Sequence, residues 1–298
     1  MLTRFKPLFF LFLAQVCVGI NIVFSKGLTN HINPFIIMTV RFTVASLFMS
    51  FLLIKSDERK RWDFHLSWLD WLVILAKGMG AGLFFNWLML TGLNLTNANS
   101  AGLITSLLPA VVVCLNVILF KQQLNTRMII AIMISVAGLI LINFESFGKG
   151  ACHALLGNFL VFAALLPEGI YYTLSKYYPV SKIPRITNSL CLAFVNLPLL
   201  YVIIAFMPAS AWHSITFYDV LAMILVGVAA GLFFFFWQTG VEQVDPAYAA
   251  LATAFMPLST VFLAWIVLGE GLTVTKTIGM FFVILSIVHY ARQQSSSA

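Results

Sequence analysis

The sequence predicts an all-α integral membrane protein with ten transmembrane helices, arranged as two inverted five-helix repeats. Three observations lead to this prediction. The chain of 298 residues is 61% hydrophobic and 9% charged, with a mean hydropathy of +0.99, which is too apolar to cover a soluble surface. Apolar stretches of about 17–25 residues, the length needed to cross a hydrocarbon core, recur along the chain. Residues of the first half also recur in order in the second half.

Ten apolar ranges follow one another, separated by turn-forming or charged residues. The predicted spans are residues 8–26, 34–54, 69–91, 98–119, 127–143, 156–176, 186–207, 219–238, 247–268 and 274–290. Arg4 and Lys6 before the first span resemble the start of a signal peptide. Because no small-residue cleavage site follows them, we expect an uncleaved first span.

The two halves of the chain share glycine, proline and polar residues at an almost constant offset, which falls only from 150 to 148. The matched pairs include Gly19 and Gly169, Ser25 and Ser175, Lys26 and Lys176, Pro34 and Pro184, Gly82 and Gly231, Gly92 and Gly240, and Pro109 and Pro257. We therefore expect two repeats, residues 1–150 and 151–298, with five spans each. An odd number of spans inverts the second copy, and inverted repeats are typical of proteins that open alternately to two sides of a membrane.

Basic residues predict the orientation of the chain. With the N-terminus inside, twelve Lys and Arg residues fall on the cytoplasmic side and three, Lys26, Lys149 and Lys276, fall outside. Arg41 and Lys77 lie within spans and are left out of this count. The positive-inside rule therefore places both termini in the cytoplasm, in what we expect to be a bacterial inner membrane. It also accounts for the net charge of +7 without a nucleic-acid partner.

Glu168 is an acidic residue deep inside a predicted span. Carboxylates at this depth are costly, so they usually face a cavity or a partner charge. Pro167 cannot donate a backbone hydrogen bond, and we expect the helix to be kinked or broken just before Glu168. Two interpretations remain open. Glu168 contacts a solute in a cavity, or it forms a structural ion pair with Arg41 or Lys77.

Other polar and aromatic residues in the spans are candidates for the same solute site. Helical spacing places Tyr171 and Tyr172 on the face of Glu168, and Asn21 occupies the repeat position of Tyr171. Lys77 could bind a carboxylate or extend to the membrane interface. The remaining candidates are Asn86, Trp87, Trp237, Gln238 and Tyr248. Taken singly, each of them can also be explained by packing or by contact with lipid.

Pro109 and Pro257 occupy matching positions in the fourth and ninth spans. Each leaves free the carbonyl four residues earlier, and this residue is a threonine in both copies, Thr105 and Thr253. Paired breaks near the middle of the membrane are typical of solute sites in transporters. A packing kink that the threonine satisfies is the alternative.

With these features the chain resembles the drug/metabolite transporter (DMT) superfamily, and in particular the ten-helix EamA-type transporters. The resemblance covers the whole chain. It rests on the two repeats, the Gly-to-Lys motif that closes the first span of each, the proline in the fourth span, and Gly269-Glu270 with Gly279 near the C-terminus. The first copy departs at Gln122, where the second has Glu270. The resemblance implies a central cavity lined mainly by spans 1, 3, 4, 6, 8 and 9, and export of small metabolites such as amino acids.

The sequence thus predicts a secondary transporter, most simply an exporter of amino acids by alternating access, with the bilayer and a small solute as partners. Metalloprotease, nucleophile-elbow and phosphate-loop motifs are missing from the sequence, so we expect neither an enzyme nor a cofactor. The alternatives are a carrier of cationic or nucleoside-bearing solutes or drugs, an uptake or exchange carrier, and a receptor or assembly subunit that transports nothing. Both a monomer and a homodimer are compatible with the sequence.

Overall fold

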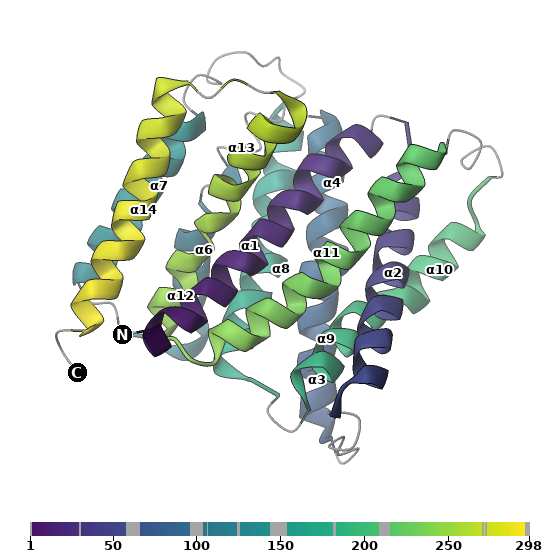
Figure 1. Cartoon of the computed structure of the whole chain (residues 1–298), viewed down its shortest axis with the longest axis horizontal. Coiled ribbons are helices and arrows are strands. Elements are labelled where there is room, and N and C mark those ends of the chain that lie inside the picture. Colours follow the sequence, from purple (N-terminus) through teal and green to yellow (C-terminus); the bar gives the residue numbers. More distant parts are fainter. Residues whose placement is uncertain are drawn as a thin grey trace.

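The computed structural model of the chain is a bundle of α-helices (Figure 1). It describes residues 2–29, 31–57, 66–95, 104–105, 107–123, 126–143, 154–180, 183–208, 215–269, 271 and 273–295. The helices of the first half are α1 (Leu2–Leu28), α2 (Pro34–Lys55), α3 (Trp68–Met79), the π-helix η2 (Gly80–Phe84), α4 (Phe85–Leu95), α6 (Leu108–Phe120) and α7 (Thr126–Asn143). Those of the second half are α8 (Ala154–Tyr177), α9 (Arg185–Phe194), α10 (Leu197–Ala205), α11 (Phe217–Val241), α12 (Pro246–Ala252), α13 (Phe255–Leu268) and α14 (Val274–Ser295).

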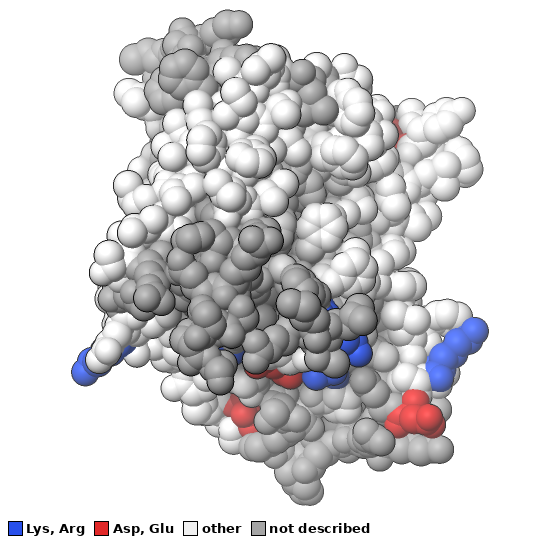
Figure 2. All heavy atoms as spheres, turned by 60° about the vertical axis from the view of Figure 1, so that its left-hand side comes forward, with Lys and Arg blue, Asp and Glu red and all other residues white. Residues whose placement is uncertain are grey.

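Seven segments are long and apolar enough to cross a membrane, and shorter apolar helices accompany them. The seven are Lys6–Ser25, Pro34–Lys55, Trp68–Gly92, Leu155–Tyr177, Arg185–Ala205, Phe217–Val241 and Tyr248–Val267. Each predicted span contains one to three helical segments, and no strand occurs in the described ranges. Figure 2 shows a broad uncharged surface, with most of the visible charged side chains toward its lower end. The predicted all-α, multi-pass membrane fold is confirmed.

Two helices begin with the same capping arrangement in the two halves. Ser67 and Asp70 form a capping box at the start of α3, and Thr216 and Asp219 form one at the start of α11. In each box the hydroxyl oxygen accepts the backbone N–H of the aspartate, and the carboxylate accepts the backbone N–H of the cap residue. The backbone N–H groups in the first turn of a helix have no carbonyl partner within that helix. The two capping boxes supply partners for them and so define where the third and eighth spans begin.

The helices pack in combinations that correspond across the two halves. α1 packs against α11 and α13, and its counterpart α8 packs against α4 and α6. α2 packs against α11 as α9 packs against α3, while α7 and α14 pack against each other at the left of Figure 1. This correspondence supports the proposal that residues 1–150 and 151–298 are related repeats. The proposed boundary itself lies outside the described residues.

Matching glycines allow two of these helix pairs to approach closely. A Cβ atom on Gly92 of α4 would lie 2.9 Å from the carbonyl oxygen of Gly157 in α8. A Cβ atom on Gly240 of α11 would lie 2.8 Å from the carbonyl oxygen of Pro7 in α1. Small residues allow membrane helices to approach closely where no hydrophobic effect drives them together. Both contacts depend on the missing side chain.

We therefore expect Gly240→Val to destabilise the bundle, because backbone atoms of α1 leave no room for the new side chain. Gly27→Val is the matched control, since a Cβ there meets nothing within 4 Å. Thermal unfolding of the purified variants in one detergent measures the difference. Equal melting temperatures for the two variants would contradict this account of the α1–α11 contact.

One predicted feature of the sixth span differs from the structure. Of the kink or break expected at Pro167, the break is absent, because α8 is continuous from Ala154 to Tyr177. A proline removes a single backbone donor, and the hydrogen bonds on either side can hold the helix together. The irregularity lies instead in the neighbouring third span, where η2 separates α3 from α4. The two features touch, because a Cβ on Gly80 would lie 2.8 Å from the carbonyl oxygen of Pro167.

The two ends of the bundle are held by different contacts. At the end of α8, Lys176 donates to the carbonyl oxygen of Val241, the last residue of α11, over 3.2 Å. Close by in the chain, the Tyr177 ring stacks on Phe120 of α6 with centroids 4.0 Å apart. At the opposite end, where α11 begins, His31 Nε2 lies 3.1 Å from an Asp219 carboxylate oxygen. A lysine-to-carbonyl hydrogen bond and an aromatic stack therefore join the helices at one end, and a histidine–aspartate contact joins them at the other.

Candidate functional site

A small cavity lies inside the bundle, between α1, α2, α8, α11 and the η2–α4 segment. We call it the charged cavity. It is lined by Val18, Asn21, Arg41, Ala81, Phe85, Glu168, Ala230, Phe233 and Phe234. Its volume of about 20 Å³ is room for roughly one water molecule. A larger solute would therefore have to displace side chains or helices.

Only one of the two carboxylate oxygens of Glu168 has a hydrogen-bond partner. The side chain is 2% exposed, and its Oε1 accepts a hydrogen bond from the Tyr172 hydroxyl over 3.2 Å. The same hydroxyl accepts a hydrogen bond from Gln15 Nε2 over 3.3 Å, so α1 helps to hold it. Oε2 is buried and has no hydrogen-bond partner. One carboxylate oxygen is therefore available to a guest in the charged cavity.

Arg41 of α2 brings the opposite charge to the same cavity. Its Nη1 donates to Asn86 Oδ1 over 2.8 Å, while its Nε is buried without a partner. Arg41 and Glu168 both line the cavity, yet in the described part of the chain no ion pair joins them. Separated buried charges are costly, and a water or a solute between them would lower that cost. The open interpretation of a direct structural ion pair with Arg41 is not what the structure shows.

Asn86 connects this guanidinium to the π-helix. Its Nδ2 donates to the carbonyl oxygens of Ala81 and Gly82, over 3.1 and 2.6 Å. Both carbonyls belong to η2, where the wider turn lies among small residues. A π-helical turn inside an α-helix often marks a functional site. Here it places the Asn86 side chain so that Nδ2 donates to two backbone carbonyl oxygens of η2, and Oδ1 accepts a hydrogen bond from Arg41.

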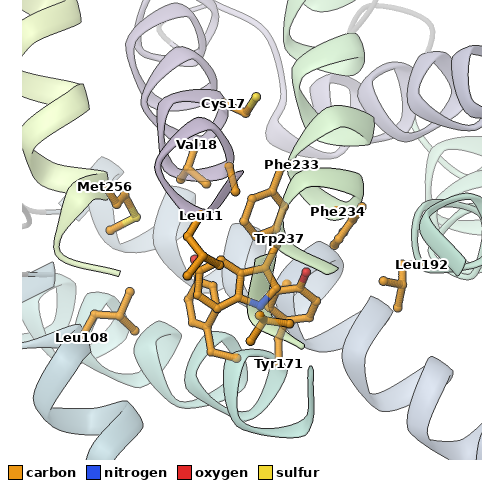
Figure 3. Close-up of a cluster of buried hydrophobic side chains, with 14 of the residues drawn as sticks. Leu11, Cys17, Val18, Leu108, Tyr171, Leu192, Phe233, Phe234, Trp237 and Met256 are labelled. Atoms are coloured by element: carbon orange, nitrogen blue, oxygen red, sulfur yellow. The ribbon is translucent and has the colours of Figure 1, made fainter. Parts of the chain in front are cut away.

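The predicted aromatic and amide residues gather beside the charged cavity. Tyr172 packs edge-on against Trp237 with ring centroids 4.4 Å apart, and the Trp237 side chain is fully buried. Tyr171 lies between Phe233 and Phe234 of α11 and the rest of α8, and Figure 3 shows these rings with Trp237 in one cluster. Gln238 Nε2 donates to Ser175 Oγ over 3.1 Å, which ties α11 to α8.

The structure separates three of the predicted candidates from the charged cavity. Lys77 is buried, and its Nζ donates to the carbonyl oxygen of Tyr178 over 2.6 Å at the end of α8. Trp87 is 42% exposed on the outside of α4. Tyr248 is buried in the first turn of α12, where its backbone N–H donates to Asp245. Asn21, in contrast, lines the cavity and donates to the carbonyl oxygen of Cys17 over 2.9 Å.

The predicted proline hinges fall where helices begin. α6 starts at Leu108, and Pro109 lies in its first turn. The ninth span is divided, because α12 ends at Ala252 and α13 starts at Phe255, with Pro257 in its first turn. Thr253 lies between the two helices and donates to the carbonyl oxygen of Ala250 over 2.7 Å. Thr105 is buried one turn before Pro109, and residue 106 is outside the described ranges.

Two parts of the site were missed in the sequence. The sequence suggests Arg41 only as an ion-pair partner of Glu168, and it offers Asn86 as one candidate among several without a role. The run from Gly78 to Gly82, with three glycines in five residues, was the available signal for an irregular third span. Nothing in the sequence shows that the Asn86 side chain, which follows this run, faces Arg41. The two residues are 45 positions apart in the chain.

The whole chain is similar to known transporter sequences. Residues 5–144 and 155–291 each match the model of the EamA-like transporter family. A Bacillus subtilis (strain 168) protein named Uncharacterized transporter YetK is 26% identical over 91% of this chain and 82% of its own length. YoaV of the same organism is 22% identical over 90% of this chain and 91% of its own, and an Archaeoglobus fulgidus transporter is 21% identical over 93% and 95%. A solved protein crystal structure covers 95% of this chain and 97% of its own with a TM-score of 0.73 at 19% identity, a likeness of fold.

Proposed function

Because the chain belongs to the EamA-like transporter family, we propose that it is a secondary transporter that moves small amino acids or similar metabolites by alternating access. One observation carries the choice of solute. The charged cavity holds a carboxylate, Glu168, and a guanidinium, Arg41, that do not pair directly. An amino acid carries the two complementary groups on one small molecule. The helix breaks at the prolines and the corresponding packing of the two halves support alternating access as its mechanism.

Flux into proteoliposomes tests this proposal. Purified protein is reconstituted, and the uptake of labelled amino acids is measured against vesicles without protein. We expect saturable flux that unlabelled amino acids inhibit. Well-folded protein that moves no solute from an amino-acid, amine, nucleoside and drug panel would favour a receptor or assembly subunit instead.

A carrier of cationic solutes is the second candidate. Phe85, Phe233 and Phe234 line the charged cavity, and aromatic faces attract organic cations. Arg41 in the same wall opposes this use, since its positive charge repels a cation. The panel above separates the candidates, because a cation carrier would move amines or nucleoside-bearing drugs in preference to amino acids.

Export, residence in a bacterial inner membrane and cytoplasmic termini belong to the same proposal. The distribution of basic residues along the sequence supports the orientation. In Figure 1 the first helix, α1, begins and the last helix, α14, ends at the same end of the bundle, as an even number of spans requires. Transport out of the cytoplasm is tested by comparing efflux from preloaded cells with and without the protein.

Cysteine labelling tests the orientation. On a cysteine-free background, we expect a membrane-impermeant maleimide to label Lys149→Cys but not Lys60→Cys in intact cells, and to label both after lysis. Both positions lie outside the described residues, so the prediction rests on the positive-inside rule alone. Labelling of Lys60→Cys alone in intact cells would reverse the orientation and leave the fold unchanged.

A further inference from the structure

Arg41 and Glu168 are the two charged residues that line the charged cavity, and neither has a charged counterpart in the other half of the chain. At the repeat offset of 150, Val18 corresponds to Glu168 and Cys191 corresponds to Arg41. Val18, the residue that corresponds to Glu168 in the first half, also lines the cavity. The charges are therefore a local departure from the repeated framework, which points to a role in the solute site.

We infer that Arg41 is a solute contact and that Arg41 and Glu168 together restrict transport to solutes that carry one anionic and one cationic group. The inference rests on the transport function proposed above and deepens it. Arg41 binds the anionic group and Glu168 binds the cationic group. Asn86 is the positioning residue, because it holds the guanidinium without filling the remaining space.

The polar atoms of the two side chains that lack a hydrogen-bond partner fit such a solute. One nitrogen of Arg41 is committed to Asn86, while Nε has no partner and lies at the edge of the guanidinium that can take a carboxylate. Guanidinium and carboxylate groups match in planar, charge-assisted geometry. Glu168 keeps Oε2 for an ammonium group, with Oε1 held by Tyr172. Each partner thus has one unsatisfied polar atom, and both are buried in the wall of one cavity.

Charge balance explains why a solute with a single charge is rejected. An amine that pairs with Glu168 leaves Arg41 uncompensated inside the membrane, and an acid that pairs with Arg41 leaves Glu168 uncompensated. Removing one partner from a buried charge pair is strongly unfavourable. A zwitterion compensates both charges, so the loaded cavity has no net charge as the helices rearrange around it.

Matched sets of solutes test the inference. We use alanine, leucine and phenylalanine, each with the amine that lacks its carboxylate and the acid that lacks its amino group, as competitors of flux in proteoliposomes. The wild-type protein should prefer at least one of the amino acids over both of its analogues by about ten-fold or more, the effect of one charge-assisted hydrogen bond. Arg41→Gln should move the preference toward the amine, and Glu168→Gln should move it toward the acid.

Further variants separate recognition from structure. Arg185→Gln is the matched control, since Arg185 pairs with Glu242 at a half-exposed site away from the cavity, and it should leave the preferences unchanged. Asn86→Ala should reduce the preference for the amino acid over its amine, whereas a purely structural loss would weaken both equally. If Arg41→Gln is poorly folded, Arg41→Gln/Glu168→Gln removes both charges and should fold without distinguishing zwitterion, amine and acid.

Two results would overturn the inference. In the first, the wild-type protein accepts the amine or the acid as readily as the amino acid. In the second, Arg41→Gln folds and keeps the wild-type order of preference. In both cases transport itself would stand. Failure of the proposed function looks different, because then no solute of any charge crosses the membrane.

Discussion

Glu168→Gln is expected to fold and to bind the transported solute about ten-fold or more weakly than the wild-type protein. Glutamine keeps the size of the side chain and a hydrogen-bonding oxygen for Tyr172, but it removes the negative charge that an ammonium group would meet. A hydrogen bond to a charged group contributes about 1.5–3 kcal/mol, which corresponds to this loss of affinity. Solute-dependent thermal shift or calorimetry measures the binding, and flux in proteoliposomes measures the transport.

The same variant distinguishes the other roles of Glu168. If the carboxylate carries a proton, Glu168→Gln keeps the affinity for solute and loses flux driven by a pH gradient. If it only balances the charge of Arg41, the variant loses stability, and Arg41→Gln in addition restores the melting temperature. Glu242→Gln, which alters an exposed ion pair, is the control for removing any carboxylate. Wild-type binding and flux in well-folded Glu168→Gln protein would exclude Glu168 from the solute site.

Trp237→Ala is expected to cause the largest loss of stability among single truncations in α11. The indole is fully buried and packs edge-on against Tyr172, with centroids 4.4 Å apart. Truncating a large buried aromatic residue costs about 3–5 kcal/mol in soluble proteins. In a bilayer the cavity and the lost contacts account for the cost, because the unfolded helices are not transferred to water. The expected result is a lower melting temperature in detergent and less folded protein in the membrane.

Trp87→Ala is the matched control for this prediction. Trp87 lies in the third span and Trp237 in the eighth, but the Trp87 side chain is 42% exposed on the outside of the bundle. Its removal leaves no internal cavity, so the melting temperature should change little. A loss for Trp87→Ala as large as that for Trp237→Ala would show that interior packing does not explain the effect.

The membrane fold could be predicted because the features that determine it, long apolar ranges and helix-capping residues, can be recognised in the sequence. A helix in lipid has to satisfy its own backbone, so each long apolar range can only be a helix. Asn33 with Pro34, and Asp245 with Pro246, mark helix starts by the residue types that cap them, and α2 and α12 begin at these positions. The break that was one of the two outcomes expected at Pro167 is absent, because the sequence shows the missing donor and not the hydrogen bonds that bridge it.

The candidate site was less predictable, since it depends on which side of each helix faces inward. Glu168 stood out because an acid within a span needs a reason. Trp87 and Trp237 carry the same side chain, and only tertiary packing turns one outward and the other inward. From the sequence, Arg41 is only a possible ion-pair partner of Glu168. The contact that decides its position runs through Asn86, and Asn86 faces Arg41 because of an irregular turn that composition does not reveal.

The π-helix in the third span has a bearing on the history of the chain. Phe85 and Thr91 are separated by five residues, whereas their counterparts Phe234 and Thr239 are separated by four. The first copy thus holds one extra residue directly after η2, and a wide turn is how a helix absorbs an insertion without losing its ends. The eighth span, which lacks the extra residue, is the unbroken α11. If residues 1–150 and 151–298 are related repeats, as proposed, a single codon gained in the first copy would be enough to make two equivalent spans unequal, and so to give one wall of the charged cavity its own shape.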